Sequence, residues 1–189
     1  GYDNAYESAN YQPTAVTSAS PNLGAGVYIF DATTGALLWN ARAGSANDVT
    51  TIDVKDENLK YSVVSQIKAF DRDADGLADN LYFGDLGGQI FRVDLNNGYN
   101  VAATSFGRVN RLANFTGLNQ RFYEMPTLSI HNNSGKRFVV VGIASGNRSF
   151  PLNQSNSYDN RIYAVYDYDI ASTQLFADSF TKTSNLTES

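Results

Sequence analysis

A short pattern of apolar residues occurs three times in this chain, and it constrains the fold more than any other feature. The copies run from Val27 to Asp31, from Ile90 to Asp94 and from Ile162 to Tyr166. Each places aliphatic and aromatic residues over a few positions, which is typical of a β-strand. Glycine, asparagine and aspartate residues, which favour turns, separate these segments from their neighbours. The sequence therefore predicts an all-β protein built from repeated units.

Other apolar segments complete the expected units. The first copy continues through the turn DATTG into a second strand near Leu37 to Trp39, which predicts a hairpin. Strands before the later copies are expected at Tyr61 to Phe70, Leu81 to Gly84, Thr127 to His131 and Phe138 to Ile143. Short strands in such repeats are typical of the four-stranded blades of a β-propeller.

The copies are spaced more widely than the roughly 40 to 50 residues of a typical propeller blade. Turn-rich insertions from Asn110 to Arg121 and from Ser145 to Asn160 are expected to account for the difference. We predict a partial β-propeller of about two and a half to three blades over residues 24–189, part of a larger propeller domain. Residues 1–23, rich in Asn, Ser, Ala and Thr, are expected to be a linker or extended segment. A β-sandwich is the alternative fold.

Composition excludes several classes of function. The chain carries 14 Lys and Arg against 19 Asp and Glu, a net charge of -5, and no basic cluster that would follow a phosphate backbone. Nucleic acid is therefore not an expected partner. The absence of cysteine excludes a thiolate zinc site and a cysteine nucleophile. No apolar run approaches the roughly 20 residues that span a bilayer, so no membrane span is expected in this segment.

The segment DRDADGLAD, from Asp71 to Asp79, has the spacing of an EF-hand-type calcium loop. Aspartates stand at the first, third, fifth and ninth positions, and Gly76 stands at the sixth, where such loops turn sharply. Ca²⁺ takes six to eight oxygen ligands, so alternating carboxylates on a curled backbone suit it. The predicted ligands are Asp71, Asp73, Asp75, the main-chain carbonyl of Leu77, and Asp79.

The loop also departs from the EF-hand pattern. Tyr82 occupies the twelfth position, where an EF-hand has a bidentate Glu, so Asp79 would complete the coordination sphere directly or through water. Residues from Leu81 onwards predict a strand, so the loop is expected to join two strands. The alternative is a solvated turn whose Asp side chains accept hydrogen bonds from the local backbone. The mutual repulsion of four nearby carboxylates favours the cation.

Together, residues 24 to 170 resemble the C-terminal propeller of the PilY-type type IV pilus tip proteins, called PilC in some bacteria. The most specific part is DRDADGLADNLYFGDLGGQIFRVDL, in which the acidic loop leads into a hairpin. The segments GVYIFDATTGALLW, FVVVGIASGNRSFPL and DNRIYAVYD support the likeness. The five predicted ligands all match the calcium loop of that family.

The resemblance implies an extracellular protein at the pilus tip on the bacterial cell surface, associated with the outer membrane. Its partners would be the minor pilins of the tip and the host-cell surface. In that family the calcium loop supports control of pilus extension and retraction, and hence twitching motility and surface adhesion. Some members bind integrins through an Arg-Gly-Asp segment, which this chain lacks.

Two other functions fit parts of the sequence. An integrin-like or lectin-like calcium propeller, which would bind protein or sugar, would be favoured by several calcium loops, and the sequence contains one. A quinoprotein dehydrogenase is suggested only by the segment from Val27 to Trp39, without a cofactor pocket. The single histidine, His131, stands beside the turn-forming Asn-Asn-Ser-Gly and is not expected to be a catalytic base. We therefore expect a non-enzymatic protein with no catalytic residues and with Ca²⁺ as its cofactor.

Overall fold

The computed structural model describes residues 24–44, 53–96, 106–148, 151, 159–171 and 186–187. These residues form strands β1 to β11 and two single-turn 3-10 helices, η2 (Thr116–Leu118) and η3 (Asp169–Ala171). The prediction of an all-β fold is confirmed. In this part of the chain no helix is long and apolar enough to cross a membrane. The linker predicted over residues 1–23 lies outside the described residues.

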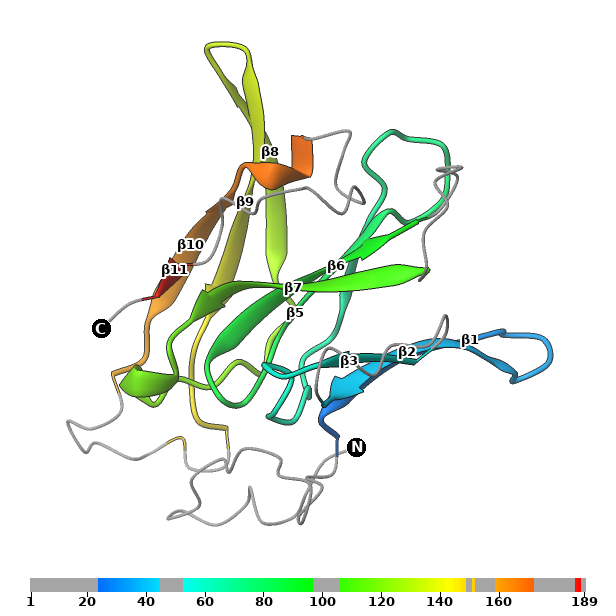
Figure 1. Cartoon of the computed structure of the whole chain (residues 1–189). Helices are drawn as coiled ribbons and strands as arrows, with labels where there is room; N and C mark the ends of the chain where they lie inside the picture. Colours follow the sequence, from blue (N-terminus) through cyan, green and yellow to red (C-terminus); the bar gives the residue numbers. More distant parts are fainter. Residues whose placement is uncertain are drawn as a thin grey trace.

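Three sheets are arranged as layers (Figure 1). The first sheet has the order β1-β2-β3 and consists of β1 (Gly26–Phe30), β2 (Leu37–Ala43) and β3 (Asp53–Asp56). The middle sheet has the order β11-β7-β6-β5-β4 and consists of β4 (Lys68–Phe70), β5 (Asn80–Gly84), β6 (Gln89–Leu95), β7 (Gly107–Asn114) and β11 (Leu186–Thr187). The last sheet has the order β10-β9-β8 and consists of β8 (Thr127–Asn133), β9 (Lys136–Ala144) and β10 (Ile162–Asp167).

The turn of the first hairpin shows why the DATTG sequence reverses the chain. The Asp31 carboxylate accepts hydrogen bonds from the backbone N–H groups of Thr33 and Thr34, at 2.8 and 2.7 Å. Gly35 follows with a φ of 72°, a left-handed conformation that glycine adopts without strain. This is the local Asp-to-backbone bonding typical of tight turns. The turn end of the β1–β2 hairpin projects beyond the rest of the molecule (Figure 1).

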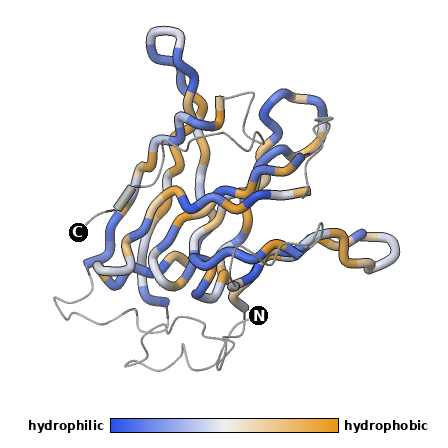
Figure 2. The backbone as a smooth tube through the Cα atoms, viewed as in Figure 1, coloured by the Kyte–Doolittle hydropathy of each residue, from blue (hydrophilic) through white to orange (hydrophobic). Residues whose placement is uncertain are grey.

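The middle sheet is covered on both faces because successive side chains of a strand point in opposite directions. On β5, Leu81 and Phe83 face the first sheet, whereas Tyr82 faces the last sheet. The core toward the first sheet includes Val27, Trp39, Ala41, Val54, Phe91, Val93 and Val109. The core toward the last sheet includes Ile90, Leu112, Val139, Val141, Ile143, Tyr163 and Val165. Hydrophobic residues accordingly follow the layered strands, while hydrophilic residues lie near the tip of the β8–β9 hairpin (Figure 2).

Some expected elements differ from the structure. The strand expected from Tyr61 is limited to Lys68–Phe70. The insertion expected from Asn110 to Arg121 is wrong in its first part, because β7 continues to Asn114. Polar side chains of β7 have partners on β6: the buried Asn110 donates to Asp94, and the partly buried Arg111 donates to Gln89 at 2.9 Å. Hydrogen-bonded polar residues can therefore occupy an interior strand. The polar composition of this segment suggested a turn and so hid the strand.

The number of strands in each sheet also differs from the expected four-stranded blade. In the described residues the sheets have three, five and three strands, whereas four per unit were expected. The short β3 pairs in parallel with β2 and was not predicted, because its sequence DVKD has one apolar residue. A complete or partial propeller ring stays a prediction.

Candidate metal centre

The acidic loop, from Asp71 to Asp79, connects two paired strands of the middle sheet. Phe70, the last residue of β4, pairs with Asn80, the first residue of β5. The Asp79 N–H donates to the Phe70 carbonyl at 2.9 Å, and the Leu95 N–H donates to the Asp79 carbonyl at 2.7 Å. The backbone of Asp79 is therefore fixed by the sheet on both sides. As expected, strands flank the loop.

Two residues in left-handed conformations curl the loop. Ala74 has a φ of 65° and Gly76 a φ of 93°. The Asp71 carboxylate accepts the N–H of Ala74 at 2.7 Å through Oδ1 and the N–H of Gly76 at 2.9 Å through Oδ2. Glycine adopts positive φ at little cost, whereas alanine is held there only by its surroundings. The side chain of Asp71 thus organises the backbone of the turn.

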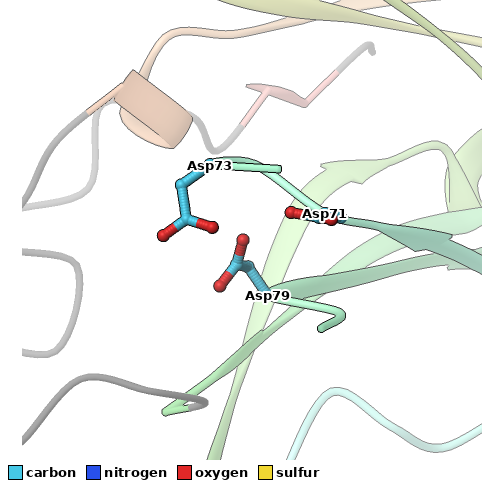
Figure 3. A group of neighbouring side chains, drawn as sticks. All are labelled: Asp71, Asp73 and Asp79. Atoms are coloured by element: carbon cyan, nitrogen blue, oxygen red, sulfur yellow. The ribbon is translucent and has the colours of Figure 1, made fainter. Parts of the chain in front are cut away.

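The curled loop brings three carboxylates together. Asp71, Asp73 and Asp79 each offer one carboxylate oxygen, and these oxygens all lie within 4.8 Å of one another (Figure 3). Carboxylate oxygens are the ligands that hard divalent cations take in proteins. Three like charges at this separation repel one another, so a cation among them would lower the energy of the loop.

Asp79 is the buried member of this group. The residue is 3% exposed, and its Oδ2 atom accepts the backbone N–H of Arg72 at 2.6 Å. Its Oδ1 atom is buried and has no hydrogen-bond partner. Burial raises the pKa of Asp79, as do the nearby charges of Asp73 and Asp71, while the Arg72 N–H acts in the opposite direction. An unpartnered buried carboxylate oxygen is costly unless a cation or a proton satisfies it.

All five predicted ligands stay predictions, and Asp75 and Leu77 lie outside the group of three carboxylates that the structure brings together. The Asp75 carboxylate accepts the N–H of Leu77 at 2.8 Å and is not part of the converging group. The Asp73 carboxylate similarly accepts the N–H of Asp75 at 3.3 Å. Such local bonds belong to the alternative of a solvated turn. They do not account for the buried Oδ1 atom of Asp79, which a cation or a proton would satisfy.

Arg72 has a role that the sequence did not indicate. Besides its backbone bond to Asp79, its Nη1 atom donates to the carbonyl of Ile170 in η3 at 3.4 Å. The acidic loop of the middle sheet therefore contacts the segment that follows β10 of the last sheet. These residues lie far apart in the sequence, and no local pattern marks Ile170 as a partner.

The comparisons with known proteins relate the chain to solved structures but to no family model. No family model matches the chain, and no curated protein matches it. Among solved structures, the chain is similar to the crystal structure of the Pseudomonas aeruginosa PilY1 C-terminal domain, with a TM-score of 0.57 and 20% sequence identity. The match covers 85% of this chain and 34% of that chain.

This likeness shows the fold. The chain spans about a third of the length of the structure that it matches. Most of its layered sheets thus have a counterpart in part of the PilY1 C-terminal domain. Because one fold serves many functions, the role of this chain depends on the site itself.

Proposed function

We propose that this chain is a non-enzymatic, calcium-binding β-sheet module of a type IV pilus protein. Two observations together carry the metal assignment: the carboxylates of Asp71, Asp73 and Asp79 converge, and the buried Oδ1 atom of Asp79 has no hydrogen-bond partner. The fold shared with part of the PilY1 C-terminal domain supports the connection with the pilus.

The chemistry of the loop favours Ca²⁺ over other common metals. The converging donors are all carboxylate oxygens, which suit hard cations, and the group contains no histidine or cysteine for zinc. Mg²⁺ needs near-ideal octahedral geometry and gives up its waters reluctantly, whereas Ca²⁺ accepts irregular sets of six to eight oxygens. Asp71, Asp73 and Asp79 would hold the ion, with Asp75 and the Leu77 carbonyl as further ligands. The ion would offset the repulsion of the carboxylates and satisfy Asp79.

Isothermal titration calorimetry with CaCl₂ on the purified chain tests this assignment. We expect one calcium site in the wild-type protein and no detectable site in an Asp79→Asn variant, which keeps the size of the side chain. Asp31→Asn is the matched control, because Asp31 also caps a turn through backbone N–H groups but is not one of the converging carboxylates. Equal calcium binding by wild type and Asp79→Asn would contradict the site.

The proposed biological role is control of pilus extension and retraction at the pilus tip, and through it twitching motility and surface adhesion. The module would be extracellular, in contact with minor pilins and with the host-cell surface. In the full-length protein within its bacterium, Asp79→Asn should reduce surface piliation and the twitching zone, whereas Asp31→Asn should leave both unchanged. Normal piliation and twitching in a strain whose purified protein has lost calcium binding would refute this role without affecting the metal site.

A further inference from the structure

A cleft of about 230 Å³, lined by both polar and apolar residues, lies where β9 ends and β10 begins. Three segments form it: the residues before β8, the residues after β9 and the residues before β10. The polar residues of its lining are Tyr123, Glu124, Ser145, Asn147, Arg148 and Asn160. None of these residues belongs to the acidic loop.

Hydrogen bonds between the segments shape this cleft. The Ser145 N–H donates to the Arg161 carbonyl at 2.8 Å, and the Arg161 N–H donates to the Ser145 Oγ atom at 2.8 Å. The Gly146 N–H donates to the carbonyl of Arg121, a buried residue, at 3.0 Å. These bonds hold backbone from all three segments in place. The backbone that carries the lining residues is therefore held in place before a ligand binds, which reduces the entropy cost of binding.

The charges in the cleft balance each other. Arg148 and Glu124 form an ion pair, and their side chains are 66% and 57% exposed. The other polar side chains of the lining are neutral: the amides of Asn147 and Asn160 and the hydroxyls of Ser145 and Tyr123. A phosphate or a metal ion would meet no uncompensated charge among these six side chains. Because Ala144 and Pro151 also line it, the cleft is instead suited to a neutral ligand that carries both hydroxyl groups and apolar surface.

We propose that this cleft binds one neutral sugar residue of a glycan. An amide side chain both donates and accepts hydrogen bonds, so it can pair with a sugar hydroxyl in either sense. The Arg148–Glu124 pair adds a charged donor and a charged acceptor, whose hydrogen bonds are stronger than neutral ones. Tyr123 supplies an aromatic ring and a hydroxyl, a combination suited to a ligand with apolar and polar faces. The volume lies below the roughly 300 Å³ lower limit for sites that take drug-sized ligands, which suits a single sugar ring.

The cleft and the acidic loop lie at opposite ends of β10. Arg161, which binds Ser145, immediately precedes this strand, whereas Ile170, which binds Arg72 of the acidic loop, follows it. Sugar binding should therefore need no calcium, and it does not depend on the metal assignment proposed above. A calcium-dependent lectin would place the sugar at the metal instead.

Saturation-transfer NMR and calorimetry on the whole chain test the proposal, with the methyl glycosides of glucose, galactose, mannose and N-acetylglucosamine as probes. At least one glycoside should bind, equally with CaCl₂ and with EGTA. Arg148→Gln and Asn160→Ala should each weaken that binding by about tenfold or more, the loss expected for one strong hydrogen bond. Arg42→Gln is the matched control, because Arg42 is also an exposed arginine in an ion pair, with Asp53 of the first sheet.

Each contrary result would overturn the proposal. Binding of none of the glycosides would do so, and so would equal weakening by Arg42→Gln. Sugar binding that disappears with EGTA and in Asp79→Asn would place the sugar at the acidic loop and refute the cleft. Retained sugar binding in Asp79→Asn, with loss of calcium binding, would support both sites separately. Both cleft variants alter exposed side chains, and circular dichroism would verify that they fold.

Discussion

Arg92 and Asp167 form a buried ion pair that joins the middle sheet to the last sheet. The Arg92 Nη1 atom on β6 donates to the Asp167 Oδ1 atom on β10 at 2.6 Å, and the two side chains are 1% and 0% exposed. Arg92 Nε also donates to Asp94 at 2.6 Å, and the Tyr82 hydroxyl donates to Asp167 at 2.9 Å. The position of one sheet on the other is thus fixed by directional contacts as well as by apolar side chains.

We expect Asp167→Asn to destabilise the fold by about 3 to 5 kcal/mol, because it leaves the buried Arg92 without one of its countercharges. The control is Asp53→Asn, which breaks the exposed Arg42–Asp53 pair and should cost about 0 to 1 kcal/mol. Urea denaturation followed by circular dichroism gives both values. Equal losses in the two variants would mean that the buried pair does not join the sheets as described.

Asp85, at the turn between β5 and β6, is a buried carboxylate outside the acidic loop. Its Oδ1 atom accepts the N–H groups of Gly87 at 3.0 Å and Gln89 at 2.8 Å. Burial raises the pKa of Asp85 to about 7, and the hydrogen bonds from Gln89 and Gly87 act against this rise. The folded protein therefore holds the Asp85 proton more tightly than the unfolded chain does, where the pKa is about 3.9.

This difference predicts a pH dependence of stability. The contribution of Asp85 is fully present below about pH 4 and is lost as the pH rises through 7, so the free energy of unfolding should fall over this range. Asp85→Asn removes the titrating group but keeps an acceptor oxygen for the two N–H groups. Urea denaturation at pH 4.5 and pH 7.5, without calcium, should show a smaller fall in the variant. The same fall in both proteins would contradict the raised pKa.

Gly87, in the same turn between β5 and β6, packs so closely that a larger residue there should clash. A Cβ atom on Gly87 would lie 2.1 Å from the ring atom Cδ2 of Tyr61, so alanine would force this ring or the backbone to move. We expect Gly87→Ala to cost about 1 to 3 kcal/mol, as overpacking does elsewhere. Gly117→Ala is the control, because a Cβ atom there would meet nothing within 4 Å. Thermal denaturation should separate the two variants, and similar melting temperatures would argue against close contact with Tyr61.

Calcium should stabilise the fold if the acidic loop binds it. At a free calcium concentration about a hundredfold above Kd, the free energy of unfolding should rise by about 2.7 kcal/mol. Asp71→Asn should abolish this rise, which differential scanning calorimetry with CaCl₂ or EGTA can measure. Asp75→Ala should also remove it if the sequence spacing identifies a ligand correctly. A normal calcium response in Asp75→Ala would limit the carboxylate ligands to the three that converge.

The sequence predicted most strands because their alternation is local. Leu81, Tyr82 and Phe83 lie on a strand as expected, since both of its faces are covered and all three positions are apolar. β7 was missed over Asn110 and Arg111, whose partners Asp94 and Gln89 lie on another strand. A polar residue can lie in the interior of a sheet when it has hydrogen-bond partners on another strand. Such partners are distant in the sequence, so a local sequence pattern does not reveal them.

The difference between local patterns and long-range contacts also applies to the candidate metal site. Asp71, Asp73 and Asp79 were predicted together because nine consecutive residues carry the whole pattern. The burial of Asp79 was not predictable from the loop, because it depends on the sheet that surrounds β5. The contact from Arg72 to Ile170 was equally hidden, because it joins segments that only the folded sheets bring together.

The position of the middle sheet between two cores has a consequence for local unfolding. The amide hydrogens of β5 and β6 should exchange with deuterated water only when the whole chain opens, because their residues are buried along the full length of both strands. The β1–β2 hairpin, with exposed Tyr28 and Phe30, should exchange much earlier. Asp79 directly precedes β5, so an ion bound there would be attached to the part of the molecule that persists longest as the fold opens.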